Sequence, residues 1–265
     1  MQLSRGSLHA GKTRLSYLQW DGKGPDLLLL HGITSNAQAW WRVAPRLVQA
    51  GFRVTAFDMP GHGQSGETDD HRIESVAQLI AQSAADLGID RMLLIGHSWG
   101  GSVALAMAVR APERVTRLVL IDPALSLTAE VGKTRIPVFT QGIGSPIDAL
   151  APALAAANPD WHDQDVHWKA EAMQQCRAEA VVGFFTRSGD WDLTPRLAEV
   201  EAPVLLLVAD PLATIIDART QRAAQGQLRA KASRLVVVPK TTHNMYRGAG
   251  YEPTLALITD WLDSR

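Results

Sequence analysis

The sequence predicts an α/β protein with a mostly parallel sheet, and two observations support that prediction. Short apolar segments suited to buried strands recur along the chain, and segments with helical spacing of apolar residues separate them. This alternation is typical of parallel sheets, because a parallel pair needs a long crossover that a helix usually supplies. The predicted buried strands cover residues 26–33, 52–57, 91–95, 115–121, 204–208 and 235–238.

The remaining elements complete this frame. Residues 3–8 and 13–20 have the pattern of two short strands joined by a turn. A helix over residues 73–87 has its apolar side chains on one face and a stop signal at Gly88. Further helices are expected near residues 40–48, over 101–110 and 216–228, and at the C-terminal end, where Pro253 takes the first position.

Residues 124–195 interrupt the alternation. No buried strand is evident there, and tryptophans and phenylalanines occur among helical spacings and prolines. We therefore expect a helical cap at residues 124–195, inserted into a core that residues 1–123 and 196–265 form. Most of its aromatic side chains would pack the helices of the cap together, and a minority would line a substrate pocket.

Composition narrows the class of protein. The chain has 265 residues, and its 26 lysines and arginines nearly balance its 27 aspartates and glutamates. Without a basic run, neither nucleic acid nor a membrane is expected as a partner. The single cysteine, Cys176, excludes an internal disulfide and fits the cytoplasm, and no Cys/His cluster has metal-ligand spacing. We expect no metal and no cofactor, and a monomer or homodimer that acts on a small molecule.

Ser98 stands between Gly96 and Gly100 at the predicted junction of a strand and a helix. A serine in such a sharp turn is strained and exposed, and the helix N-terminus behind it favours developing negative charge. A Cβ at either glycine would clash where backbone meets backbone. We interpret Ser98 as a nucleophile. The pentapeptide alone also fits a serine that merely caps the helix.

Two other motifs resemble nucleotide sites. Residues 6–13 match a phosphate loop, which needs a buried strand before it and a helix after it. Only five residues precede Gly6, and the following segment meets Asp21 and Gly22 within about two helical turns, so we do not expect a nucleotide site. Residues 61–66 match a dinucleotide fingerprint, yet no helix opens on them, and Glu67 and Asp69 would repel a pyrophosphate. We therefore expect a tight loop there, tied down by Asp58.

Polar residues follow several predicted strands. His31 and Gly32 come after the first buried strand, and His243 follows the last one. Two candidate acids, Asp122 and Asp210, follow the strands at 115–121 and 204–208. Because parallel strands end at one edge of a sheet, these residues should meet Ser98 there. We prefer Asp210 to Asp122 because its strand directly precedes that of His243.

These features together resemble the α/β-hydrolase superfamily, in the form that carries a lid. Residues 30–32, 58–65 and 96–101 match its motifs, and Ser98, an acid and His243 follow its chain order. The resemblance implies that Ser98 attacks a carbonyl, His243 moves the proton and Asp210 orients the imidazole. The family usually places its acid a few residues further past the strand, and Asp122 occupies an alternative position known in the superfamily.

The resemblance also implies an oxyanion hole and a reaction. The backbone N–H groups of Ile33 and Trp99 would stabilise the oxyanion. We expect a carboxylesterase-like enzyme that cleaves an ester, thioester or lactone of a small, largely apolar substrate through an acyl-enzyme. A carbon–carbon bond hydrolase or amidase with the same triad, and a non-catalytic binding protein on this fold, stay open as alternatives. The candidate pocket residues are His31, Trp161, Trp168 and Trp191.

Overall fold

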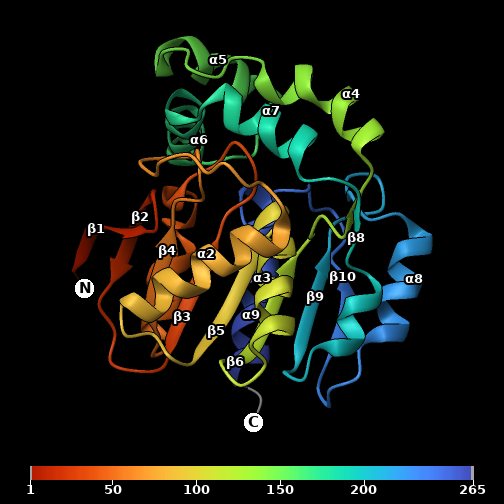
Figure 1. Ribbon diagram of the computed structural model, residues 1–265. Helices are drawn as coiled ribbons and strands as arrows, with labels where there is room; N and C mark the ends of the chain where they lie inside the picture. The colour runs from red at the N-terminus through yellow and green to blue at the C-terminus, as the bar shows by residue number, and fades with distance from the viewer. Residues whose placement is uncertain (1, 264–265) are drawn as a thin grey trace.

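The computed structural model describes residues 2–263, and its centre is an eight-stranded sheet (Figure 1). Only the pairs β1–β2 and β2–β4 are antiparallel, and the other neighbours run parallel. The predicted mostly parallel sheet is therefore confirmed. In spatial order the strands are β1 (Leu3–Ala10), β2 (Thr13–Trp20), β4 (Arg53–Phe57), β3 (Asp26–Leu30), β5 (Met92–His97), β6 (Val115–Ile121), β9 (Val204–Val208) and β10 (Arg234–Val237).

Helices cover both faces of this sheet. On one face lie α2 (Ile73–Asp86), α3 (Trp99–Arg110) and α8 (Ala218–Gln227), and on the other lie α1 (Val43–Gln49) and α9 (Tyr251–Asp263). Strand β3 shows why: Leu28 and Leu30 pack into the first layer, and Leu27 and Leu29 pack into the second. Because both faces of the sheet are buried, its strands are continuously apolar. Each buried leucine side chain contributes about 1.5–3 kcal/mol to the free energy of unfolding.

Some helix boundaries differ from the predicted ones. Helix α3 begins at Trp99, directly after Ser98, and α8 begins at Ala218 because the Asp217 side chain accepts a hydrogen bond from Thr220 N at 2.7 Å. Helix α9 begins at Tyr251, so Pro253 is its third residue and not its first. Proline is tolerated there because the first-turn N–H groups have no partner within the helix.

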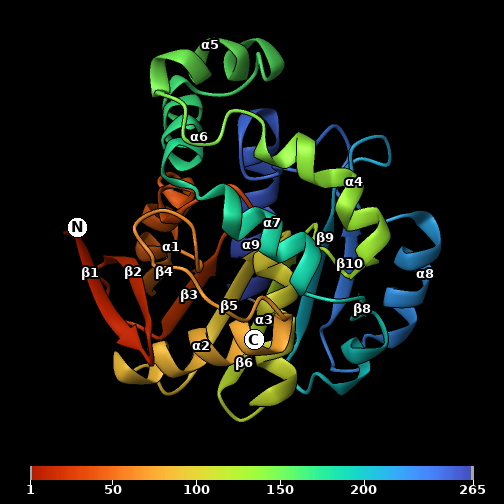
Figure 2. The same cartoon turned by 45° about the horizontal axis from the view of Figure 1, so that its top comes forward.

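Residues 124–195 contain four helices that lie over the upper end of the sheet in Figure 1. We call α4 (Ala129–Thr140), α5 (Ile147–Ala157), α6 (Asp163–Gln175) and α7 (Ala178–Arg187) the cap helices. Helix α4 packs on α7, α5 packs on α6, and α6 contacts the short helix η1 (Ala37–Trp40). In Figure 2, α4 extends toward the α8 side of the molecule, and α5 and α6 lie on the α1 side.

A short antiparallel pair joins the cap helices to the core. Strands β7 (Ser126–Leu127) and β8 (Trp191–Asp192) pair with each other at the two ends of the inserted segment. The sequence predicts no buried strand in this segment. Two residues are too few to show a strand period, so only the pairing itself reveals these elements.

Both nucleotide-like motifs have other roles. Residues 6–13 lie in the β1–β2 hairpin, where Gly6 faces Tyr17 and Ala10 faces Thr13. Residues 58–66 form a tight loop, and the buried Asp58 carboxylate accepts hydrogen bonds from Ala37 N at 2.8 Å and Gln64 N at 3.0 Å. Within residues 2–263, no helix combines the length and apolar character needed to span a membrane.

Candidate active site

Ser98 occupies the sharp turn between β5 and α3. Its φ of 52° and ψ of −120° lie in a region that residues with side chains rarely adopt, so the backbone is strained there. A Cβ on Gly96 would lie 2.3 Å from Gly100 O, and one on Gly100 would lie 2.2 Å from Leu30 O. Only glycines fit at these two positions. The turn therefore brings Ser98 to the carboxyl end of the sheet beside the loop after β3.

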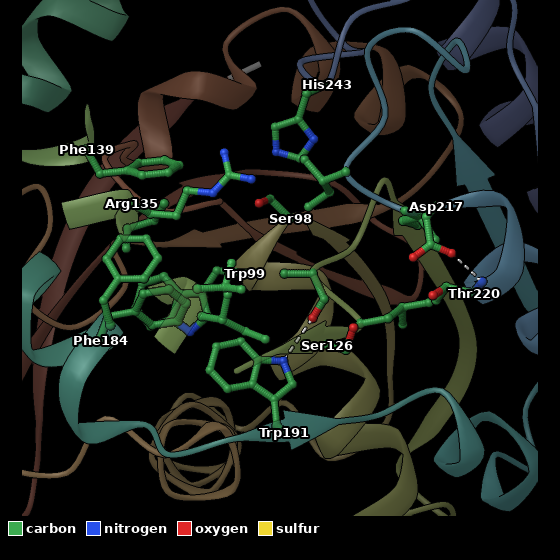
Figure 3. Close-up of a pocket in the computed structure, with 18 residues that line it drawn as sticks. Ser98, Trp99, Ser126, Arg135, Phe139, Phe184, Trp191, Asp217, Thr220 and His243 are labelled. Carbon is green, nitrogen blue, oxygen red and sulfur yellow. Dashed lines mark hydrogen bonds between the residues drawn. The ribbon is translucent and has the colours of Figure 1, made fainter. Parts of the chain in front are cut away.

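His243 lies in the loop after β10, and its Nδ1 is 2.7 Å from Asp122 Oδ2. An Nδ1 that donates to this carboxylate leaves Nε2 as an acceptor, which is the tautomer that a general base needs. The backbone of His243 is held as well, because His97 Nε2 lies 2.9 Å from His243 O. Figure 3 shows the imidazole and the Ser98 hydroxyl in the same pocket.

Asp122 is completely buried and has several hydrogen-bond partners besides His243. Its carboxylate accepts hydrogen bonds from Ala209 N at 3.2 Å, Ile215 N at 3.2 Å and Thr214 Oγ1 at 2.5 Å. These donors fix the orientation of the carboxylate toward the imidazole. Asp122 has a φ of 40°, which turns the chain sharply where β6 ends.

The sequence favours Asp210 as the partner of His243, and the structure corrects this expectation because His243 Nδ1 contacts Asp122. Asp210 Oδ2 accepts a hydrogen bond from Lys240 N at 2.8 Å, and Oδ1 accepts one from Leu212 N at 3.1 Å. Among the described residues, His243 contacts the carboxylate of Asp122 and not that of Asp210. Hydrogen bonding to Lys240 N lowers the pKa of Asp210, so it is an ionised carboxylate that ties two loops together.

Ser98 lies between two cavities that share His243. We call the first the apolar pocket. Its volume is about 240 Å³, and its walls include Leu127, Phe139, Phe184, Phe185 and Trp191. We call the second the basic pocket. Its volume is about 90 Å³, and its walls include Thr34, Lys169, Tyr246 and Arg247.

Two backbone amides lie beside Ser98. Ile33 and Trp99 both line the apolar pocket, and Ile33 also lines the basic one. Within residues 2–263, neither N–H donates a hydrogen bond to a carbonyl or side chain. A Cβ on Gly32 would lie 3.0 Å from Ser98 Cβ, so the loop after β3 passes directly over the serine. Two free donors near a nucleophile suit an oxyanion.

The candidate pocket residues fall into different places. Trp191 lines the apolar pocket, as expected. Trp161 is buried, and the Arg247 guanidinium lies over it, with Arg247 Cζ 4.7 Å from the Trp161 ring centroid. Trp168 packs on His167.

His31 does not line either cavity. Its Nε2 accepts a hydrogen bond from Met59 N at 2.9 Å, and its Nδ1 lies 2.7 Å from Gly32 O. Burial lowers the pKa of His31 to about 4, so it is a neutral structural residue.

Three basic side chains that line the pockets were not predicted from the sequence. Lys169 and Arg247 line the basic pocket, and Arg135 lines the apolar pocket. A lone lysine or arginine in a helix or a loop has the pattern of a surface residue. Only the folded chain brings these three side chains, which are far apart in the sequence, toward Ser98. The sequence contains no local signal that would have distinguished them from other charged residues.

Comparison with known proteins agrees with this architecture. Residues 25–175 match the alpha/beta hydrolase fold family, so the chain belongs to that family. It is 32% identical over 208 residues to the N-formylmaleamate deformylase of Pseudomonas putida (strain KT2440), an alignment that covers 77% of each chain. It is also 36% identical over 115 residues to a pimeloyl-[acyl-carrier protein] methyl ester esterase of Vibrio campbellii, with 43% of each chain aligned.

A solved structure extends the likeness to the whole chain. E-2-(Acetamidomethylene)succinate hydrolase superimposes with a TM-score of 0.86 over 99% of this chain and 100% of that one, at 24% identity. At this identity the likeness shows the fold alone. The fold, the family and the sequence relatives together define this chain as an α/β hydrolase.

Proposed function

We propose that this protein is a serine hydrolase that cleaves acyl bonds with Ser98, His243 and Asp122. The observation that carries the proposal is the buried Asp122 carboxylate, 2.7 Å from His243 Nδ1, at the strand end next to the Ser98 turn. A carboxylate, an imidazole and a strained serine at one sheet edge are the parts that acyl transfer to water requires. Asp122 thus replaces Asp210 in the role that the sequence analysis gave to the acid.

The reaction follows from the roles of these groups. His243 Nε2 takes the hydroxyl proton as Ser98 Oγ attacks the acyl carbon, and the N–H groups of Ile33 and Trp99 stabilise the oxyanion. The imidazolium then protonates the leaving group, which departs and leaves an acyl-enzyme on Ser98. Water, deprotonated by His243, attacks the ester carbon, and Ser98 regains its proton as the acid product leaves.

An ester is the first substrate class, because the apolar pocket of about 240 Å³ offers room for a short apolar chain beside Ser98. An amide-type bond is the second candidate. A relative 32% identical across 77% of the chain is named as a deformylase of N-formylmaleamate. We further propose that residues 124–195 act as a cap over the site, because Phe139, Phe184 and Trp191 from this segment form much of the apolar wall.

The test compares p-nitrophenyl acetate and butyrate with the matching p-nitroanilides, which separates ester from amide turnover. Ser98→Ala should lower kcat by about a million-fold, as removal of a triad serine does. Ser4→Ala, an exposed serine on β1, serves as the matched control and should leave turnover unchanged. A Ser98→Ala protein within about tenfold of wild type would contradict the proposal.

A further inference from the structure

The basic pocket contains two positive side chains that face no negative one. Lys169 comes from α6 and Arg247 from the loop after β10, and both line the cavity beside Ser98 and His243. Among the residues that the structure describes, neither side chain forms an ion pair. Burying an unpaired charge is costly, so such a pair calls for a compensating anion.

Arg247 shows the missing partner most clearly. The residue is 3% exposed, and its Nε is buried without a hydrogen-bond partner among residues 2–263. Its Cζ lies 4.7 Å from the Trp161 ring centroid and 5.4 Å from that of Tyr246, so aromatic faces hold the guanidinium in place. Aromatic contacts leave the Nε–H at the edge of the guanidinium unsatisfied. That planar edge matches the geometry of a carboxylate.

Lys169 also has donor capacity to spare. Its Nζ donates to Thr34 O at 2.7 Å and to Thr34 Oγ1 at 2.8 Å, whereas an ammonium group has three N–H donors. Burial, together with the nearby positive charge of Arg247, lowers the pKa of Lys169 to about 7. A negative group bound between the two side chains would reverse this effect by favouring the charged amine.

The surroundings increase the positive character of the site. Arg135 reaches from α4 into the neighbouring apolar pocket, and Figure 3 shows its guanidinium extending toward Ser98 and His243. Asp217 is the one acidic residue among the described residues that line either pocket, and its carboxylate caps α8 through Thr220 N. The cavity as a whole therefore attracts anions.

We propose that the basic pocket is a carboxylate-binding subsite, in which Lys169 and Arg247 bind an acidic group of the substrate. The inference rests on the proposed function, because it takes Ser98 as the reacting group. A cavity of only about 90 Å³ next to Ser98 places the acid within a few bonds of the acyl carbon. The substrate class is a monoester or monoamide of a short dicarboxylic acid, with its other end in the apolar pocket.

Binding can be measured without turnover by using the Ser98→Ala protein and calorimetry. The probes are glutarate and its neutral counterpart glutaramide, which differ in charge and little in size. Glutarate should bind more tightly than glutaramide. Adding Lys169→Gln or Arg247→Gln should weaken glutarate binding about 10- to 100-fold, because each removes a charged hydrogen-bond donor. Lys133→Gln removes an exposed cation of α4 and should change nothing.

Two charge-conserving variants distinguish loss of the positive charge from loss of the fold. Lys169→Arg and Arg247→Lys should keep more glutarate affinity than the glutamine variants, which a merely structural role would not predict. Equal binding of glutarate and glutaramide by the Ser98→Ala protein would overturn the subsite. An equal loss of glutarate affinity in Lys133→Gln would also overturn it, because the net positive charge of the protein and not the two pocket side chains would then explain the binding.

The carboxylate subsite and the proposed reaction are tested by different measurements, so one can be wrong without the other. The subsite is tested by binding to a protein that lacks Ser98, so its result does not depend on which residue is the nucleophile. The proposed reaction is tested by turnover of neutral esters and anilides, which do not need the basic pocket. With active enzyme, the KM of monomethyl glutarate should rise in the glutamine variants more than that of methyl valerate.

Discussion

The two pockets that meet at Ser98 differ in volume, composition and origin. The apolar pocket, of about 240 Å³, takes its aromatic wall from α4, α7 and β8. The basic pocket, of about 90 Å³, combines core loops with Lys169 of α6 and shares Phe139 of α4 with the apolar pocket. The first offers dispersion and burial of apolar surface, which are tolerant of ligand shape. The second offers fixed charged donors, which are selective for an anion. Under the two proposals, substrate length would be recognised in the apolar pocket and substrate charge in the basic pocket, with Ser98 in the wall of both.

The largest expected effect concerns the machinery that both pockets share. Asp122→Asn should lower kcat about ten-thousand-fold, because an amide no longer holds His243 in the required tautomer. The loss should be the same for methyl valerate and monomethyl glutarate, since neither pocket contains Asp122. Steady-state kinetics with both esters measures it.

Asp210→Asn is the matched control for this prediction. Its carboxylate bonds to Lys240 N and Leu212 N and not to His243, so turnover should stay near that of wild type. Thermal melting should show that both asparagine variants are folded. If Asp210→Asn loses kcat and Asp122→Asn keeps it, the acid of the triad lies after β9 and not after β6.

The next effect is on the stability of the fold, and it concerns two completely buried histidines, His31 and His62. Burial, with smaller contributions from the Lys169 and Arg247 charges, lowers the pKa of His31 to about 4, and burial lowers the pKa of His62 to about 3. An unfolded chain binds these protons at about pH 6.5, so the free energy of unfolding should fall as pH drops from 6.5 toward 4. Each histidine contributes roughly 3 kcal/mol to this loss.

Urea unfolding at pH 7 and pH 4.5 measures this dependence. His62→Asn keeps a donor for Pro60 O, to which the His62 Nδ1 lies 2.9 Å away, and it removes the titrating ring. This variant should lose less stability on acidification than wild type does. His9→Asn, at an exposed position on β1, should behave like wild type. The same pH slope in both variants would remove His62 from the explanation.

The smallest effect separates the two pockets directly. Trp191→Ala should reduce turnover of p-nitrophenyl hexanoate about tenfold relative to the acetate, because Trp191 forms part of the apolar wall. Glutarate binding should not change in Trp191→Ala. Trp161→Ala should weaken glutarate binding and leave the preference between hexanoate and acetate unchanged, because the Trp161 ring supports Arg247. Chain-length profiles and calorimetry on both variants make the comparison.

Trp168→Ala serves as the control for both variants. Trp168 packs on His167 and lines neither pocket, so its replacement should leave both the chain-length profile and glutarate binding unchanged. If all three tryptophan variants lose activity uniformly, with the ranking of esters preserved, these residues act only in packing and the two pockets are not independent.

Sequence reasoning located most of the fold because its signals are local. The strand β5, the turn at Ser98 and the helix α3 are contiguous in the chain, and the glycines at 96 and 100 show the need for close backbone contact in the sequence itself. His243 was found in the same way, as the histidine in the loop after β10. Helix ends were less certain, because capping by Asp217 or the strained turn before Trp99 shifts them by a residue or two.

The sequence by itself determined the α/β class, the parallel sheet and the edge at which Ser98 and His243 meet, because hydrophobic periodicity and strand order are written along the chain. Only the tertiary structure decided which acid touches His243. Strands β6 and β9 are neighbours that end at the same edge, and hydrogen bonds from Ala209, Thr214 and Ile215 turn Asp122 inward. The meeting of Lys169 with Arg247 was decided the same way, since contact between distant residues depends on how helices pack and not on local pattern.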